Sequence, residues 1–340
     1  MSDTYRAIRL TRFAPSFREG CDIVDLPVAQ PGPGEVRVQN LWCGVNGIFD
    51  TQIARNAVDY VKIGLPTFTG VEALGRVLAV GEGVTDLAVG DAVVTTRFTG
   101  GYREENTGPA ANFLKVPEAA PEWLALASTG VSAMVALTVI GELKHGETVA
   151  ISAAAGGLGH LMVQIAVDMG CHVVAVCGGK DKCDFVRSLG AARVIDYRSE
   201  DVGAVLAAEY KNKLNVAVDT VSGSIYDAFL ANLANHGRLV VGGAAADLNG
   251  KPEIVSAPRI ANDIYYKGAS VRGFMNGLLT AHWPEARARL FPMYQQGRIK
   301  VTFDSEHHTG LAGVYDAVER LLSGRSMGKV IVDIAGGASQ

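Results

Sequence analysis

The sequence is poor in cysteine, with five in 340 residues, and none of the five is paired in a C-x-x-C spacing. An odd number without such pairs argues against a disulfide framework and against a structural zinc knuckle. Cys171, Cys177 and Cys183 are evenly spaced, but they are expected around a strand and at a helix start. We therefore interpret the cysteines as free thiols in or near the core.

The chain also lacks an apolar leader and a strong charge of one sign. Its first residues, MSDTYRAIRLTRF, contain no hydrophobic segment of the signal-peptide kind, and no run is expected to reach membrane-spanning length. The formal net charge of −4 offers no electrostatic reason for binding nucleic acid or an anionic membrane. We expect a cytoplasmic protein with a small-molecule substrate, no nucleic-acid partner and no membrane partner.

Apolar β-branched runs alternate with helical segments from about residue 147 onward. A chain of 340 residues, 48% hydrophobic and 19% charged, suffices for two domains with substantial cores. Apolar strands joined by crossover helices are typical of a doubly wound parallel sheet in an α/β fold. The expected strands are 148–152, 172–176, 193–197, 215–219, 238–243 and 270–274. The expected helices are 159–169, 181–189, 201–209 and 224–235.

The first 120 residues differ, because short strand-like runs are punctuated by PGPG, GEG and VGD with little helical periodicity. This pattern predicts a β-rich, turn-rich domain. After residue 276 we expect helices near 283–296 and 311–323, followed by a strand, GKVIVDI, that rejoins the first domain. The predicted domains are therefore 1–124 with 276–340, and 125–275.

The stretch AAAGGLG, residues 153–159, stands at the first strand–helix junction of the predicted parallel sheet. A phosphate-binding turn needs small residues for a tight turn, for close approach of N–H groups to a pyrophosphate, and for helix–strand packing. Ala154 takes the first role if its φ stays negative, and Gly156 and Gly159 take the other two. The next helix would point its positive end at the phosphates. The predicted cofactor residues here are Ala154, Gly156, Gly157, Leu158 and Gly159.

The second predicted strand ends in VCGGKDK, which lacks the carboxylate that an NAD-preferring site places there. Gly178 and Gly179 are small, and Lys180 and Lys182 are cations that suit a ribose 2′-phosphate. This pattern favours NADPH, although both lysines are also consistent with a solvated helix start. Tyr197, at the end of the third predicted strand, is expected near the adenosine.

Six motifs occur in order along nearly the whole chain: PGPGEV (31–36), GVN (44–46), VGEGVTDLAVGDAV (80–93), AAAGGLGHLMVQIA (153–166), LGAARVIDY (189–197) and GKVIVDI (328–334). With this set the sequence resembles the medium-chain dehydrogenase/reductase superfamily. Within it, the sequence is most similar to the zinc-free branch of quinone oxidoreductases and prostaglandin (enone double-bond) reductases. The resemblance implies a GroES-like catalytic domain and a Rossmann NADPH-binding domain, with the substrate cleft between them.

Zinc-containing members of this superfamily carry a cysteine in the GVN region and a histidine before the glutamate of GVEALG. Here these positions are Asn46 and Val71, and only Glu72 remains. Neither Asn nor Val supplies a thiolate or imidazole ligand, and we interpret the adjacent His307 and His308 as a solvated loop pair. We therefore expect no metal. Hydride must then go to an acceptor that needs no Lewis acid, such as an activated C=C or a quinone.

The predicted catalytic residues are Asn46, Asp50 and Tyr60. Asn46 replaces a metal ligand and should face the nicotinamide, although it also suits a turn before Gly47. Asp50 lies close to where relatives carry an acidic residue, displaced by one position. The hydroxyl of Tyr60 suits a hydrogen bond to a substrate carbonyl or enolate, although the ring is equally consistent with capping its loop. Tyr102 is expected to pack in a strand.

Further cofactor residues are expected at the carboxyl ends of the later strands, where open α/β sheets bind ligands. The glycines among them are also consistent with tight turns. The resemblance places Ser132 near the nicotinamide and Lys329 near a cofactor phosphate. The remaining predicted cofactor residues are Asp219, Thr220, Gly242, Gly243, Phe274 and Asn276.

We therefore predict a homodimeric, NADPH-dependent, zinc-independent reductase that transfers hydride to the C=C of an α,β-unsaturated carbonyl compound or to a quinone. The enolate would be held by Tyr60 or a cofactor ribose hydroxyl and protonated from solvent. An enoyl-thioester (CoA or carrier-protein) reductase and a non-catalytic NADPH-binding structural protein are the alternatives. Substrate identity is expected to depend on residues 47–66 and 244–268.

Overall fold

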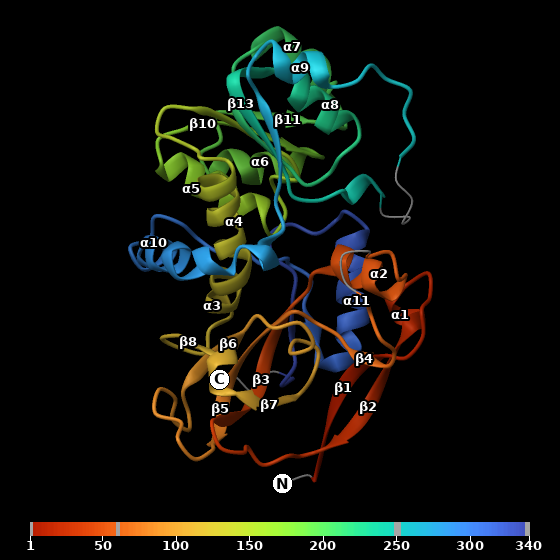
Figure 1. Cartoon of the computed structure of the whole chain (residues 1–340), viewed down its shortest axis with the longest axis vertical. Coiled ribbons are helices and arrows are strands. Elements are labelled where there is room, and N and C mark those ends of the chain that lie inside the picture. Colours follow the sequence, from red (N-terminus) through yellow and green to blue (C-terminus); the bar gives the residue numbers. More distant parts are fainter. Residues whose placement is uncertain (1–2, 59–61, 248–252, 337–340) are drawn as a thin grey trace. The chain divides into compact units, whose positions relative to one another are not determined.

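The computed structural model describes residues 3–58, 62–247 and 253–336 of the chain. The chain divides into two compact units (Figure 1). Unit 1 consists of Met1–Ser128 and Phe303–Gln340, and unit 2 consists of Thr129–Thr302. Unit 1 thus contains both ends of the chain.

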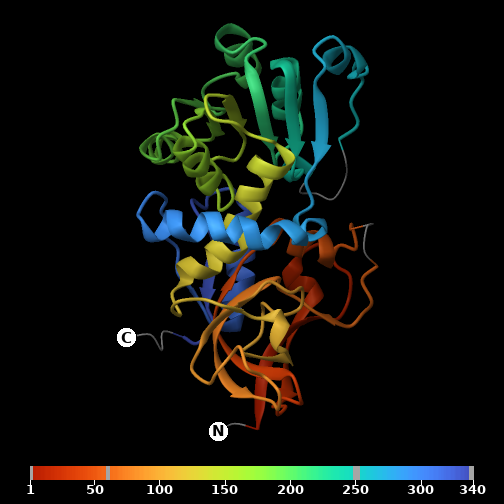
Figure 2. The same cartoon turned by 60° about the vertical axis from the view of Figure 1, so that its left-hand side comes forward.

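Unit 2 is built on one six-stranded parallel sheet of order β11-β10-β9-β12-β13-β14. Counted along the chain this order is 3-2-1-4-5-6, which is the Rossmann order and confirms the predicted doubly wound sheet. The strands are β9 (Thr148–Ile151), β10 (His172–Cys177), β11 (Arg193–Asp196), β12 (Leu214–Asp219), β13 (Leu233–Val241) and β14 (Ser270–Gly273). Figure 2 shows β14 at one edge of this sheet.

Four helices of unit 2, α5 to α8, contact the strands of the parallel sheet, and each buries apolar residues. The α5 helix contacts β9 and β10, α6 contacts β10 and β11, and α8 contacts β12 and β13. The strand residues Val149, Ala150 and Ile151 are fully buried beneath these helices. The helices are α4 (Val131–Val135), α5 (Gly159–Asp168), α6 (Lys180–Ser188), α7 (Val202–Glu209), α8 (Ser224–Ala231), α9 (Ala261–Tyr265) and α10 (Trp283–Gln295).

The helix α10 belongs to unit 2, so the second dividing point lies at residue 303 and not at the expected 276. The helix contacts α4 and buries Ala286, Leu290 and Met293. No pattern in the sequence indicates which domain α10 joins. Because the final strand was expected to rejoin the first domain, everything after the sixth strand was assigned to that domain.

Unit 1 contains two sheets, one of order β15-β16-β3-β5-β6-β8 with β7 on β3, and one of order β2-β1-β4. Its strands are β1 (Thr4–Leu10), β2 (Cys21–Pro27), β3 (Glu35–Gly44), β4 (Thr67–Phe68), β5 (Glu72–Val80), β6 (Ala92–Thr95), β7 (Glu105–Pro109), β8 (Leu114–Lys115), β15 (His308–Thr309) and β16 (Ile331–Asp333). Its helices are α1 (Phe17–Gly20), α2 (Gly47–Ala54), α3 (Pro121–Ala125) and α11 (Gly310–Leu322).

The last strand of the chain returns to the first sheet of unit 1, as GKVIVDI predicts. β16 pairs antiparallel with β3, with Val332 opposite Cys43. One buried apolar cluster joins β1, α2, α11 and β16 through Ile8, Ile53, Val314 and Val332. This packing holds the ends of β3 and β5 beside α2 and β16.

One expectation about apolar runs is wrong. The helical run Pro121–Ile140 has 20 residues and a mean hydropathy of 1.8, which is long and apolar enough to cross a membrane. In the structure 72% of the apolar 18-residue window of that run is buried, as in the core helix of a folded protein. Length and composition alone therefore do not distinguish this helix from a membrane-spanning one, whereas its burial is typical of a core helix.

Candidate active site

The side chain of Asn46 does not cap α2, although Asn46 is the N-cap residue of this helix. Asn is among the residues most often found capping a helix, yet Asn46 is the N-cap of α2 and makes no side-chain cap. Its Nδ2 instead donates to Glu72 Oε1 at 2.9 Å, and its Oδ1 accepts from Lys329 Nζ at 3.5 Å. The amide is therefore held from both ends by charged groups.

Glu72 and Lys329 form a buried ion pair next to Asn46. Lys329 Nζ lies 2.6 Å from Glu72 Oε1, and the two side chains are 4% and 0% exposed. Nζ also donates to the carbonyl of Val45 at 3.0 Å. A Cβ at Gly44 would lie 2.3 Å from Glu72 Oε1, so glycine is needed there for the carboxylate to fit.

Asp50 lies in the same group of side chains and is only 3% exposed. The hydroxyl of Tyr102 donates to Asp50 Oδ2 at 2.5 Å, and the N–H of Asn46 donates to the same oxygen at 3.3 Å. Burial raises the pKa of Asp50 to about 7, although both hydrogen bonds and Lys329 oppose the shift. Burial also raises the pKa of Tyr102, so its hydroxyl remains a neutral donor.

The structure thus brings together two of the three predicted catalytic residues, Asn46 and Asp50. Tyr60 lies outside the described residues, so its role stays a prediction. Tyr102 was expected in a strand but lies in a bend before β7, where it contacts Asp50. The adjacency of Tyr102 and Lys329 to this group was not predicted, because residues so distant in sequence leave no local signal.

Lys329 was predicted near a cofactor phosphate, and its position argues against that role. Its ammonium is enclosed in unit 1 by Glu72 and Val45. The expectation for His308 is also wrong, since it is 7% exposed at the start of β15, whereas His307 is exposed. Among the described residues, no three His, Cys, Asp or Glu side chains are grouped to hold a metal ion.

In unit 2, the predicted phosphate loop lies between β9 and α5. The left-handed residue of the turn is Ala153 (φ +47°), and Ala154 is buried with its N–H donating to Val176. A Cβ at Gly159 would lie 2.3 Å from the Ala153 carbonyl, whereas one at Gly156 would meet nothing closer than 3.3 Å. Gly159 is thus needed for the start of α5 to pack against the backbone of Ala153 and Ala154, and at Gly156 even a Cβ would be a tight contact. Their contact with a cofactor stays a prediction. Gly157 and Leu158 complete the turn.

The carboxyl ends of β10 and β11 form the predicted adenosine side of the site. A Cβ at Gly178 would lie 2.4 Å from the ring of Tyr197, so the exposed tyrosine covers this glycine. Gly179 has φ +96° and donates to Asp196 Oδ1 at 2.8 Å. Arg198 Nη1 lies 3.2 Å from where a Cβ of Gly179 would stand. This exposed guanidinium is a cation that sequence reasoning missed.

The two lysines of VCGGKDK differ in their surroundings. Lys180 is engaged by Asp184, one turn along α6, at 2.5 Å. Lys182 lies in the first turn of α6 and is partly buried. The 2′-phosphate prediction for Lys182 stays a prediction, and Arg198 lies beside the same strand ends as a further cation.

The Asp219 side chain binds the backbone of the turn that follows β12 and does not lie on the surface where a cofactor would bind. It is fully buried, and it accepts from Ser152 Oγ at 2.7 Å. It also accepts from the N–H groups of Val221 and Ser222, each at 2.9 Å. Thr220 N–H donates to Ser152 Oγ, so the ends of β9 and β12 are tied together. We therefore correct the predicted cofactor contact of Asp219 to a positioning role.

The other predicted residues gather at the carboxyl ends of β12, β13 and β14. A Cβ at Gly242 would contact Phe274 at 3.2 Å, and one at Gly243 would meet Thr220 at 3.0 Å. Asn276 donates to Ser132 Oγ at 2.8 Å and accepts from Trp283 Nε1 at 3.0 Å. Their contact with a cofactor stays a prediction.

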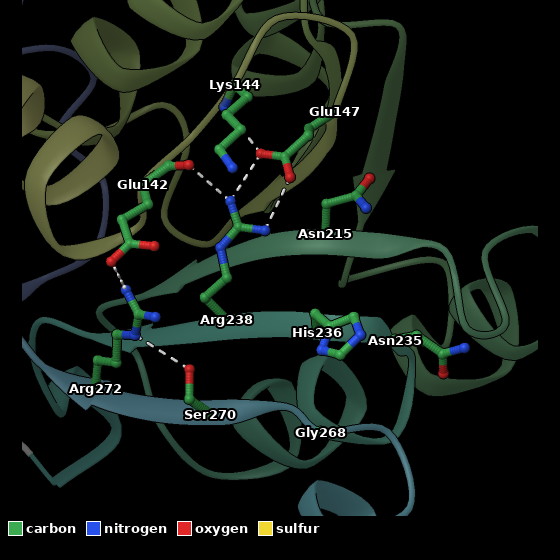
Figure 3. A pocket seen from close by; sticks show the side chains of 10 residues that line it. All are labelled: Glu142, Lys144, Glu147, Asn215, Asn235, His236, Arg238, Gly268, Ser270 and Arg272. Atoms are coloured by element: carbon green, nitrogen blue, oxygen red, sulfur yellow. Dashed lines mark hydrogen bonds and ion pairs between the residues drawn. The ribbon is translucent and has the colours of Figure 1, made fainter.

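A pocket of about 430 Å³ lies at the amino ends of the strands, where β9, β12 and β13 begin (Figure 3). Arg238 makes two bonds to Glu147 at 2.8 Å and donates to the carbonyls of Gly141 and Glu142. Arg272 pairs with the Glu142 carboxylate at 2.8 Å. The arginines and glutamates of this pocket thus pair with one another, and Arg238 also caps carbonyls at the end of the helical segment that finishes at Ile140. The pocket is distinct from the predicted cofactor site, which lies at the carboxyl ends of the strands.

Two family models match the chain, the alcohol dehydrogenase GroES-like domain over residues 32–119 and the zinc-binding dehydrogenase over residues 157–291. Prostaglandin reductase-3 of Bos taurus is 32% identical over 337 residues, or 96% of this chain and 88% of the relative. A probable quinone oxidoreductase of Leishmania amazonensis is 30% identical over 338 residues, 97% and 98% of the two chains. A mycobacterial protein solved with NADPH matches with a TM-score of 0.83 at 28% identity, covering 96% and 99%.

These matches show that the chain belongs to the medium-chain dehydrogenase/reductase superfamily. It falls in the zinc-free branch that contains prostaglandin reductases and quinone oxidoreductases, and it is an oxidoreductase. The predicted fold class, a GroES-like domain with a Rossmann domain, is confirmed.

Asp50→Asn is expected to remove a pH dependence of stability. The folded-state pKa of about 7 exceeds the ordinary 3.8, so between pH 4 and 7 the folded protein holds a proton that the unfolded chain lacks. This contribution is complete below pH 4 and is lost as the pH rises to 7. The wild-type stability relative to the variant should fall by roughly 2–4 kcal/mol between pH 4 and 8 in urea unfolding.

Asp304→Asn is the matched control, with the opposite sign. Burial opposes the charge of Asp304, but bonds from Arg320 and the Met327 N–H outweigh it and lower the pKa. Its stabilising contribution is therefore present above pH 4 and is lost as the pH falls. Equal pH profiles for the two variants would contradict this account.

Lys329→Met is expected to destabilise the protein by about 3–5 kcal/mol, because it leaves the Glu72 carboxylate buried without a cation. The double variant Lys329→Met/Glu72→Gln should recover most of that loss, since no charge remains buried. Denaturant unfolding at pH 7 measures both. A double variant no more stable than the single one would show that the pair is not the source of the loss.

Proposed function

We propose that this oxidoreductase uses NADPH to reduce the activated C=C of an α,β-unsaturated carbonyl compound or a quinone, without zinc. The observation that carries the proposal is the Asn46 amide fixed between Glu72 and Lys329. An amide held in this way offers a hydrogen-bond donor at the position where zinc-containing relatives carry a thiolate ligand. The names of the relatives, prostaglandin reductase and quinone oxidoreductase, support the same reaction class.

The loop and strand ends of unit 2 fit NADPH. Gly156 has no side chain to hinder the approach of a pyrophosphate to the loop backbone, and α5 begins at Gly159. Tyr197 and Lys182 would hold the adenosine and its 2′-phosphate, with Arg198 beside Gly179. When bound, NADPH supplies a hydride. The complex of the mycobacterial relative with NADPH supports this cofactor.

The chain's own groups would act on the substrate oxygen. One N–H of the Asn46 amide is used by Glu72, and the second is available to donate to a substrate carbonyl. A buried carboxylate beside a developing oxyanion would oppose it, and Lys329 cancels that charge. Burial raises the pKa of Asp50 to about 7, so its carboxyl carries less negative charge near neutral pH than an ordinary aspartate would. Tyr60 remains the predicted hydroxyl donor to an enolate, which is then protonated from solvent.

The test is NADPH consumption with a panel of enones, quinones and enoyl-CoA thioesters, with NADH in parallel. We expect turnover of an enone or a quinone, faster with NADPH than with NADH, because Lys182 and Arg198 favour the 2′-phosphate. Asn46→Ala should lower kcat at least tenfold while NADPH affinity stays within about twofold, since it removes one oxyanion donor.

Each outcome of this panel decides something. Turnover of enoyl-CoA alone would replace the proposal with the thioester alternative, and turnover of nothing would remove the catalytic assignment. Faster turnover with NADH would contradict the cofactor preference. Stoichiometric zinc in the active protein, measured by elemental analysis, would overturn the metal-free mechanism.

We further propose that the enzyme works in the cytoplasm as a homodimer. β14 is an edge strand, and edge strands present unpaired backbone groups. Tyr265 and Tyr266, just before it, are each 77% exposed and contact each other edge to face, so together they form an exposed aromatic pair. Light scattering should give twice the mass of one chain, and Tyr265→Ser/Tyr266→Ser should shift it toward one. A wild-type monomer at micromolar concentration would contradict the proposal.

A further inference from the structure

His160 is the second residue of α5, it is fully buried, and sequence reasoning gave it no role. Both nitrogens of its ring have backbone partners. Nε2 lies 3.2 Å from the N–H of Thr302, and Nδ1 lies 3.0 Å from the carbonyl of Gly156. A backbone N–H only donates, so Nε2 is the acceptor and the ring proton is on Nδ1. The neutral ring therefore donates to the Gly156 carbonyl.

The carbonyl of Gly156 belongs to the predicted phosphate loop, and His160 binds it twice. The backbone N–H of His160 donates to it at 3.0 Å, as does the ring Nδ1–H. A trans peptide is planar, so its C=O and the following N–H point in opposite directions. Since the Gly156 C=O points toward His160, the N–H of Gly157 points away from it, out of the helix start. Outward N–H groups at a helix start are what a pyrophosphate binds.

The ring is held in this orientation from its other side. Gln164 lies one turn further along α5, on the same face as His160. Its amide bonds both backbone groups of Lys300, at 2.9 and 2.8 Å, and also donates to the His160 carbonyl at 3.0 Å. The side chains of His160 and Gln164 thus hydrogen-bond the backbone of residues 300–302, as a paired strand would. The segment is fixed, so the imidazole that accepts from Thr302 cannot rotate freely.

We propose that His160 is a positioning residue of the cofactor site, which sets the direction of the Gly157 N–H toward the pyrophosphate of a dinucleotide. The inference rests on the proposed function, because it assumes that this loop binds NADPH. It assigns to a buried imidazole a role that exposed residues of the loop cannot fill, since Gly156 and Gly157 have no side chains to orient their shared peptide.

Two substitutions separate the two bonds of the ring. In His160→Asn the amide nitrogen replaces Nδ1, so the donor to Gly156 is kept and the acceptor for Thr302 is lost. In His160→Gln the amide reaches the Nε2 position, so the contact with Thr302 is kept and the donor to Gly156 is lost. His160→Leu removes both. The readout is binding measured by calorimetry, for NADPH and for adenosine 2′-monophosphate, which has the 2′-phosphate and no pyrophosphate.

The expected result is a roughly tenfold weaker NADPH affinity in His160→Gln and His160→Leu, with His160→Asn within about twofold of wild type. Affinity for adenosine 2′-monophosphate should be unchanged in all three variants, which also shows that the site is folded. Equal NADPH affinity in His160→Asn and His160→Gln, or a parallel loss for both ligands, would overturn the positioning role. A wild-type protein that binds adenosine 2′-monophosphate but not NADPH, or neither, would instead refute the proposed function.

Discussion

A carboxylate with no exposed surface, such as Glu72, keeps its charge only beside a cation and hydrogen-bond donors, because desolvation of an isolated charge costs several kcal/mol. Lys329 and Asn46 supply that cation and that donor, and the arrangement dictates much of unit 1 around them. It requires glycine at position 44, it lies next to the pairing of β16 with β3, and it takes the Asn46 amide away from capping α2. The orientation of Asn46 follows from the need to satisfy Glu72.

Two carboxylates that lie close to Asn46 in space have different partners and hence different chemistry. Glu72 has the ammonium of Lys329, whereas Asp50 has the neutral hydroxyl of Tyr102 and a backbone N–H. Burial raises the pKa of Asp50, and its two hydrogen bonds and the charge of Lys329 only partly oppose that shift. One carboxyl thus orients an amide, while the other keeps its proton up to about pH 7 and so adds less negative charge beside the proposed oxyanion position.

The parallel sheet of unit 2 was predictable because its signals are local. Apolar β-branched strands, crossover helices and the small residues of AAAGGLG each occupy a short window, and the order of the strands follows from the fold class. The cluster of unit 1 was predictable only in part. Asn46 and Asp50 were found from a motif, but Lys329 is 284 residues from Val45, whose carbonyl it binds. Only the return of β16 to β3 makes them neighbours, and no periodicity in the sequence encodes that contact.

The misassigned Asp219 and the overlooked His160 share one physical origin, which is that cofactor loops are made of backbone. Sequence reasoning looks for side chains that touch a ligand, and so it assigned Asp219 to the cofactor surface and gave His160 no role. In the structure both are fully buried, and both bind the backbone of loops at the carboxyl ends of strands. A glycine-rich loop has no side chains to order it, and the entropy of an unordered loop would weaken ligand binding. Buried polar groups behind such loops supply that order, and they are therefore part of the site although they are hidden from the ligand.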